Sequence, residues 1–231
     1  MRFIAVAGSS PGVGKTTLCR SLARWLAEAG LRVDHFEEEH VLSHPRFARV
    51  AAEFTGTGVV DSASFVEATV DYLADAASAG VDVTITDALV PWIPSLLAFG
   101  HTEQSIHAVL DDFARKVGAV PTLAVYLDGD ADTALRRAAA REEPGWLRWF
   151  GDKLARYDQV PADPTRTDLL DFLAKQRQTE LTALERQPWH LVVVERAHER
   201  APEAVLDTVL DAVTDFLGIP AQPRGAGTGP S

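Results

Sequence analysis

The sequence predicts an α/β fold in which a mostly parallel five-stranded sheet lies between two layers of helices. Two observations point to this three-layer arrangement. Short apolar runs rich in β-branched residues alternate with longer segments of helical periodicity, a pattern typical of a parallel sheet covered on both faces. The chain has 231 residues, of which 46% are hydrophobic, so it is long enough to bury one full core.

The predicted strands and helices follow one another in regular order. We expect strands at residues 3–7, 32–36, 81–88, 122–128 and 190–195. We expect the principal helices at residues 16–28, 45–54, 62–78, 103–117 and 202–217. The first helix has apolar residues at Leu18, Leu22, Trp25 and Leu26 on one face and ends before Gly30. A long helical region rich in arginine and tryptophan follows the fourth strand and is interrupted by prolines.

The chain shows no internal repeat and no linker that would divide it. We therefore expect a single domain over residues 1–219, with a helical lid at about residues 137–165. Residues 220–231 are rich in glycine and proline and almost free of apolar side chains, so they are expected to be disordered.

Composition narrows the classes of partner. The formal net charge of −11 argues against a surface for nucleic acid or anionic membranes. The only cysteine, Cys19, falls inside the first predicted helix, which fits a core residue in a reducing cytoplasm. No cationic segment followed by an apolar run opens the sequence, so a cytoplasmic protein is expected. A homodimer is a possible assembly.

The segment SSPGVGKTT lies between the first predicted strand and the first predicted helix, where a phosphate-binding P-loop belongs. Its glycines permit backbone angles that direct amide groups into one concavity, and the helix start adds a positive dipole end. The expected nucleotide-binding residues are Pro11, Gly12, Val13, Gly14, Lys15, Thr16 and Thr17. Lys15 is expected to reach the β- and γ-phosphates of ATP. One departure from the motif is Ser9, which occupies the place of the first glycine.

The third predicted strand, VDVTITDA, delivers Asp87 to the edge of the sheet where ligands bind. An acid at the end of an apolar strand is typical of a Mg²⁺ ligand in such proteins. We therefore expect Thr16 and Asp87 to hold Mg²⁺ together. A simple helix cap is the alternative interpretation of Asp87.

Acidic residues also follow the second predicted strand, in the run VDHFEEEH. Asp34 and Glu38 alternate onto one face of an extended chain, and Glu37 falls on the other. A carboxylate at this edge can orient an acceptor or accept its proton, so these three residues are candidate catalytic acids. A solvated acidic loop is the alternative interpretation.

These segments together resemble the P-loop kinases of the thymidylate kinase and deoxynucleoside kinase type. The run VYLDGDADTALRRAAARE is similar to the fourth-strand motif of that family, with Arg137 and Arg141 on the matching places. The resemblance implies that these arginines contact the donor phosphates and that Glu38 aligns the acceptor. It implies ATP as donor and Mg²⁺ as cofactor. The sequence departs from the family at Ala88, where an arginine usually follows the acid. The contact of that arginine is either missing or supplied from elsewhere, with Arg46 and Arg49 as the candidate replacements.

The expected function is therefore an ATP-dependent kinase that transfers the γ-phosphoryl group to a small-molecule hydroxyl or phosphate acceptor, such as a nucleoside, a nucleotide or a natural product. The alternative is a nucleotide-dependent switch or partitioning-type ATPase. The sequence lacks a second signature lysine in the loop, an N-K-x-D motif and a D-x-x-G switch segment, all of which would favour that alternative. A uridine-kinase-like or antibiotic-phosphorylating enzyme stays open.

Overall fold

The computed structural model describes residues 1–89 and 92–220. Apart from Pro220, the predicted disordered tail at residues 220–231 lies outside the described residues.

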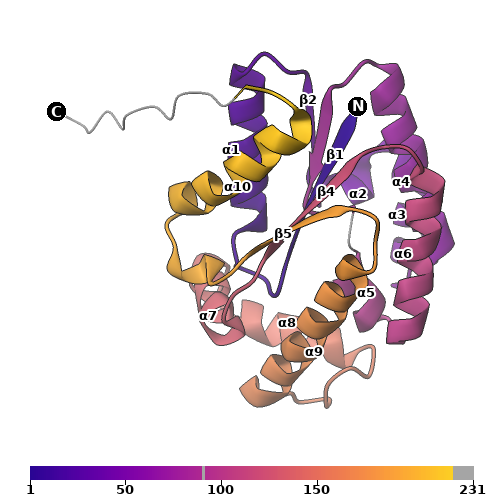
Figure 1. Cartoon of the computed structure of the whole chain (residues 1–231). Coiled ribbons are helices and arrows are strands. Elements are labelled where there is room, and N and C mark those ends of the chain that lie inside the picture. The colour runs from indigo at the N-terminus through magenta and orange to yellow at the C-terminus, as the bar shows by residue number, and fades with distance from the viewer. Residues whose placement is uncertain (90–91, 221–231) are drawn as a thin grey trace.

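The centre of the molecule is one sheet of five strands, all parallel (Figure 1). The strands are β1 (Arg2–Gly8), β2 (Val33–Phe36), β3 (Val83–Thr86), β4 (Thr122–Leu127) and β5 (His190–Val194). Their order across the sheet is β2-β3-β1-β4-β5, so β1 is central and neither of its neighbours is the next strand in sequence. This confirms the α/β class and the five predicted strands. The carboxyl ends of all the strands lie at one edge, where ligands bind in open parallel sheets.

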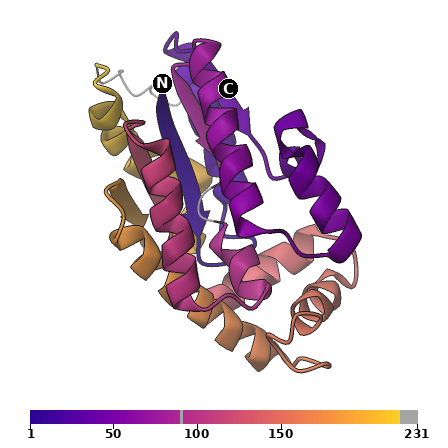
Figure 2. The ribbon, with the colours of Figure 1, turned by 90° about the vertical axis from the view of Figure 1, so that its right-hand side faces the viewer.

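Helices surround the sheet and complete the three layers (Figure 2). The α-helices are α1 (Lys15–Glu28), α2 (His40–Ser43), α3 (Ala48–Thr57), α4 (Ser62–Ser78), α5 (Ile93–Ala98), α6 (Glu103–Val117), α7 (Ala131–Arg141), α8 (Trp146–Ala155), α9 (Arg166–Glu185) and α10 (Pro202–Leu217). Two 3-10 turns, η1 (Pro45–Phe47) and η2 (Ala197–Glu199), join some of them. The helices α1 and α10 cover one face, whereas α4, α6 and α9 cover the other. The lower end of the sheet in Figure 1, where β1 ends, is surrounded by α5, α7, α8 and part of α9.

Burial explains why these residues form strands. All six residues of β4 are buried, and in β1 only Arg2 is exposed, as expected for parallel strands covered on both faces. Alternate residues face different layers: Ile4 packs toward α1 and α10, while Phe3 packs toward α4 and α6. The central strands are thereby fixed in register, so the positions of the residues that follow them are fixed as well.

The third strand is shorter than the sequence pattern predicts. The prediction covered residues 81–88, whereas β3 begins at Val83 and ends at Thr86. At its start, the amide of Val81 donates to Ala76 O at the end of α4. At its end, Thr86 Oγ1 accepts hydrogen bonds from the amides of Ala88 (3.0 Å) and Leu89 (3.2 Å). These bonds turn the chain out of the sheet immediately after Thr86 and leave Asp87 at the edge.

The short helices α2 and α5 were not predicted, because each has too few residues to show a periodicity. The arginine-rich region resolves into α7, α8 and α9, and a capping box between Thr165 and Asp168 fixes the start of α9. Each helix in the described ranges, 1–89 and 92–220, is too short or too polar to span a bilayer.

Candidate functional site

The loop between β1 and α1 has the backbone geometry of an anion-binding turn. Gly12 (φ 82°) and Gly14 (φ 111°) both adopt the left-handed conformation. Gly14 is the N-cap of α1, and no side chain accepts a hydrogen bond from the first turn of that helix. The first turn also contains no acidic residue. Its amide donors are therefore open to an external anion, which the positive end of the helix dipole favours.

Gly12 is also required because helix α7 lies directly against the loop. A Cβ atom added at Gly12 would lie 2.5 Å from Ala134 O and 3.2 Å from Ala138 Cβ. Any side chain at this position would therefore force α7 away from the loop. This close approach places the α7 segment that carries Arg137 beside the loop. Arg137 is exposed, and within the described residues its guanidinium has no hydrogen-bond or ion-pair partner.

Ser9, the departure from the glycine motif, joins the loop to the end of β4. Its amide donates to Leu127 O (3.1 Å). Its hydroxyl donates to Gly129 O (3.2 Å) and accepts from the Gly129 amide (3.1 Å). A serine side chain therefore makes two hydrogen bonds at a position where a glycine would make none, so the substitution is compatible with the loop.

Lys15 is the first residue of α1, and its side chain folds back across the loop. Its Nζ donates to Ser10 O at 3.3 Å. In the same loop the Ser10 hydroxyl is buried and has no hydrogen-bond partner among the described atoms. The loop thus places a lysine ammonium beside the uncapped start of α1, and both are groups that can bind phosphate oxygens.

Thr16 and Asp87, the predicted Mg²⁺ ligands, meet at the edge of the sheet. Thr16 Oγ1 donates to Asp87 Oδ2 at 2.5 Å, although the two residues are 71 positions apart. The second oxygen, Asp87 Oδ1, is buried and has no hydrogen-bond partner in the parts of the chain that are described. A buried carboxylate oxygen without a partner is costly unless a ligand satisfies it. A hydroxyl and a carboxylate are hard oxygen donors, so this pair fits Mg²⁺.

The protein donors alone do not form a complete metal cage. Within residues 1–89 and 92–220, no three His, Cys, Asp or Glu side chains are grouped so that they could hold a metal ion. Mg²⁺ in phosphate-binding sites commonly keeps waters and takes only one or two protein ligands besides phosphate oxygens. The Thr16–Asp87 pair is consistent with a site of that kind.

The three candidate acids in and after β2 have different environments. Glu37 forms a bidentate ion pair with Arg20 of α1, at 3.2 Å and 2.8 Å. Hydrogen bonding to this arginine holds the pKa of Glu37 below its usual value. Glu38 lies in the following turn, where its side chain is exposed and has no partner among the described residues. Asp34 is two residues before the end of β2 and accepts a hydrogen bond from the Tyr72 hydroxyl of α4.

The structure therefore joins Thr16 to Asp87 and places Glu37 at the neighbouring strand end. Asp34 instead contacts Tyr72. Phe36 pairs with Thr86 in the sheet, so Glu37 and Asp87 follow neighbouring strand ends. His35, beside Glu37, has its pKa lowered mainly by burial. Asp34 pairs with Thr84 inside the sheet and turns toward the aromatic cluster on α4. This position does not favour a catalytic role for Asp34, and that role stays a prediction.

The remaining predicted arginines differ in how freely they can bind a ligand. Arg141 is exposed and donates to Glu142 Oε1 from Nε (2.9 Å) and Nη2 (2.6 Å). Arg46 and Arg49, the candidate replacements for the arginine missing after Asp87, are both paired with carboxylates. Among these arginines Arg137 is therefore the best placed to contact a ligand at the loop.

Sequence reasoning missed two residues near this edge. Arg20, which holds Glu37, is four positions after Thr16 on the helix, and this spacing was a signal that could have found it. Arg177 of α9 forms a bidentate ion pair with Asp128, at 2.6 Å for both hydrogen bonds. No sequence signal connects these two residues, because they are 49 positions apart and lie on different elements.

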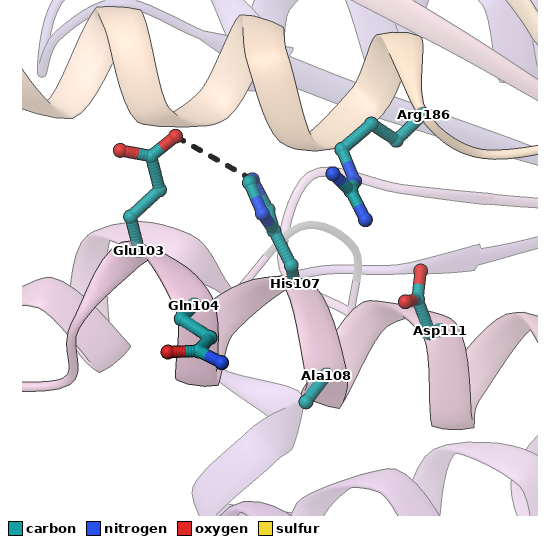
Figure 3. Close-up of a pocket in the computed structure, with 6 residues that line it drawn as sticks. All are labelled: Glu103, Gln104, His107, Ala108, Asp111 and Arg186. Carbon is teal, nitrogen blue, oxygen red and sulfur yellow. Dashed lines mark ion pairs between the residues drawn. The ribbon is translucent and has the colours of Figure 1, made fainter.

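A broad surface groove of about 630 Å³ lies between α6 and the end of α9 (Figure 3). It is lined by Glu103, Gln104, His107, Ala108, Asp111 and Arg186. Glu103 and His107 approach each other to 3.8 Å across one turn of α6. None of the predicted site residues lines this groove, so it is separate from the site at the β1–α1 loop.

Comparison with known proteins does not assign the chain to a family. No family model matches the sequence. Over 67 residues, 29% of this chain, it is 39% identical to cobyric acid synthase from Paracidovorax citrulli (strain AAC00-1), and the matched part is 13% of that protein. An unliganded crystal structure of a sugar kinase from Janibacter sp. HTCC2649 is 20% identical, with 95% of both chains covered and a TM-score of 0.48.

Proposed function

We propose that the protein is an ATP-dependent kinase of the P-loop type, which transfers the γ-phosphoryl group to a small-molecule acceptor. The observation that supports this most directly is the contact between Thr16 Oγ1 and Asp87 Oδ2, with Asp87 Oδ1 buried and unsatisfied. It joins a phosphate-loop motif to a strand-ending acid at the edge where ligands bind. Neither feature alone specifies a nucleotide, but the two in contact match the donor set of a nucleotide–Mg²⁺ site.

In this proposal the donor phosphates lie over the β1–α1 loop. The open amides at the start of α1 and the Lys15 ammonium bind the phosphate oxygens. Arg137 lies on α7, next to the two alanines that pack on Gly12, and supplies a second positive charge. Fixed positive groups around the transferred phosphoryl group stabilise the charge in the transition state, which is most of what catalysis of this reaction requires.

Thr16 and Asp87 are the residues that would hold Mg²⁺. When bound, Mg²⁺ would supply positive charge that stabilises the phosphoryl group during transfer. The protein's own contribution is to hold the Thr16 hydroxyl and the Asp87 carboxylate together before the nucleotide arrives. Their preorganisation reduces the entropy lost on binding.

Glu38 is the proposed residue for orienting the acceptor or accepting its proton. Its side chain is free and follows β2, next to the strand end that carries Asp87. Glu37 is less suited to act as a base, because the bidentate contact with Arg20 stabilises its ionised form. The assignment of Glu38 also rests on the resemblance to thymidylate and deoxynucleoside kinases.

The proposal is tested by measuring ATP binding and acceptor-dependent ADP release for the wild type and for Lys15→Ala. We expect Lys15→Ala to reduce the rate of phosphoryl transfer by roughly a hundredfold or more, because it removes the positive charge that stabilises the transferred phosphoryl group. Its melting temperature should not change, because Lys15 is not part of the core. The matched control is Lys116→Ala at the far end of α6, where the ammonium pairs with Asp112 at 3.0 Å.

Equal phosphoryl transfer by the wild type and Lys15→Ala would contradict the proposal. ATP hydrolysis that no acceptor stimulates, but that a protein partner does, would instead favour the nucleotide-dependent switch.

A further inference from the structure

Arg20 beside the end of β2, Arg49 beside the start of α4 and Arg46 beside the end of α4 are all paired with carboxylates. From this we propose that the acceptor is an uncharged or positively charged hydroxyl compound and not a phosphorylated one. The inference rests on the proposed kinase function and narrows its substrate class. A phosphorylated acceptor carries about two negative charges at neutral pH, so its site needs free cationic donors.

Arg46 lies on η1, in the segment after β2, and its guanidinium is paired with carboxylates of α4. Nε donates to Asp75 Oδ2 at 2.5 Å and Nη2 donates to Asp75 Oδ1 at 2.8 Å. Nη1 lies 3.9 Å from Asp71 Oδ2 on the same helix, α4. The Asp75 carboxylate binds along the Nε–Nη2 edge of the guanidinium, an edge through which a phosphate could also bind. Arg46 is therefore held against the end of α4 that leads into the start of β3.

Arg49 belongs to a second carboxylate network. Its Nε donates to Glu53 Oε1 at 2.9 Å, and its Nη2 lies 4.0 Å from Asp61 Oδ2. Glu53 also accepts hydrogen bonds from the Ser64 hydroxyl (2.8 Å) and from the Asp61 amide (3.0 Å). These contacts fix Glu53 and, through it, the guanidinium of Arg49.

The position after Asp87 supplies no charge either. Ala88 stands where the resembling kinases carry an arginine, and it packs in the same buried apolar cluster as Phe36 and Phe65. On the opposite side, Arg20 is committed to Glu37. Arg20, Arg46 and Arg49 are therefore all paired with carboxylates.

The net negative charge of residues 37–75 also disfavours a phosphorylated acceptor. Residues 37–75 contain eight carboxylates but only two arginines, Arg46 and Arg49. A dianionic acceptor brought to this part of the surface would meet an excess of negative charge. Like charges brought together at a binding surface discriminate strongly against the wrong ligand.

Arg156 is a cation near this region that a phosphorylated acceptor could use. It follows α8 and has no partner among the described residues. Its neighbour Tyr157 donates from its hydroxyl to Gly58 O at 2.5 Å, which places this segment beside the end of α3 (Figure 2). The experiment must therefore include a variant at Arg156.

The test compares acceptors that share a framework but differ in charge. We would measure kcat/KM for glucose, glucosamine and glucose 6-phosphate, and for thymidine and thymidine 5′-monophosphate, with ATP and Mg²⁺. The inference predicts transfer to uncharged or cationic members, with kcat/KM at least about tenfold higher than for the phosphorylated partner. It also predicts that Arg156→Gln leaves this ratio unchanged.

A higher kcat/KM for a phosphorylated acceptor than for its uncharged partner would overturn the inference. Loss of that preference in Arg156→Gln would identify Arg156 as the cation responsible. ATP binding without transfer to any uncharged or cationic member would also overturn it, while leaving the donor site intact. Loss of ATP binding itself would contradict the proposed function, so the two failures are distinguishable.

Discussion

Glu37 and Glu38 are neighbours in the sequence, but the structure gives them different chemistry. Glu37 is tied to Arg20 by two hydrogen bonds, whereas Glu38 and Glu39 are exposed in the turn that follows. An ionised carboxylate held by arginine is a poor proton acceptor, because the ion pair stabilises its charged form. At the scale of single residues, Glu37 is held by arginine and Glu38 is exposed, so the two acids suit different parts of the proposed mechanism.

We expect Glu38→Gln to retain ATP affinity but to reduce phosphoryl transfer by roughly a hundredfold or more, the usual cost of losing a general base. Glu39→Gln is the matched control and should have little effect. The measurement is single-turnover transfer together with calorimetric titration of ATP. Unimpaired transfer by Glu38→Gln would move the role to Glu37 or Asp34. Unimpaired transfer in Glu38→Gln, Glu37→Gln and Asp34→Asn alike would show that this acidic run is not catalytic.

A second residue-scale prediction concerns Gly12, whose replacement should loosen the loop. Gly12→Ala combines a left-handed backbone with a Cβ that would lie 2.5 Å from Ala134 O. We expect it to lower the free energy of unfolding by roughly 2 kcal/mol or more and to weaken ATP binding.

The control for Gly12→Ala is Gly145→Ala. Gly145 has a similar backbone (φ 97°) but no atom within 4 Å of an added Cβ. The control should cost only about 1 kcal/mol, the penalty of the left-handed conformation itself. Equal destabilisation by the two substitutions in urea titrations would show that the contact between the loop and α7 is not important.

At the scale of elements, helix α9 is attached to the sheet through a buried carboxyl group. Glu180 is 1% exposed, and its Oε2 accepts a hydrogen bond from the Tyr126 hydroxyl of β4 at 2.8 Å. Gln176 Nε2 donates to the other oxygen at 3.4 Å. Burial raises the pKa of Glu180 to about 8, because the ionised form is poorly solvated there.

This raised pKa predicts how stability depends on pH. An unfolded glutamate loses its proton near pH 4.3, whereas the folded protein keeps it until about pH 8. Between these values the folded state binds more protons than the unfolded state, so stability falls as pH rises, by at most about 1.4 kcal/mol per pH unit.

We expect Glu180→Gln to flatten this part of the pH profile, since the amide preserves the acceptor for Tyr126 but does not titrate. Above pH 8 the variant should be more stable than the wild type. Urea unfolding at several pH values measures the difference, and parallel profiles for both proteins would contradict the account.

The regular elements were predictable where local periodicity decides them. The helices α6 (Glu103–Val117) and α10 (Pro202–Leu217) have the predicted bounds, because each has a long amphipathic pattern and clear end signals. The short helices α2 and α5 show no such pattern, and β3 was predicted too long because the turn made by Thr86 Oγ1 is not visible in the pattern of β-branched residues.

At the scale of the whole molecule, the strand order brings the candidate site together. Because β3 lies directly beside β1, Asp87 reaches Thr16 at the start of α1. The sequence singled out these two residues from a motif and a strand end, and the structure places them in contact, whereas their role as Mg²⁺ ligands stays a prediction. It did not predict the pairing of Arg46, Arg49 and Arg177 with carboxylates, because such ion pairs depend on how distant helices pack.

The most direct test of the central claim is the Mg²⁺ dependence of ATP binding, measured by calorimetry for the wild type and Asp87→Asn. The control is Asp82→Asn. Asp82 lies just before the start of β3, at the opposite end from Asp87, and its carboxylate accepts a hydrogen bond from the Arg32 amide at 2.8 Å. We predict that Mg²⁺ tightens ATP binding to the wild type and to the control. Asp87→Asn should lose that gain, by about tenfold or more in affinity. Absence of ATP binding by the wild type, or an unchanged Mg²⁺ dependence in Asp87→Asn, would contradict the account.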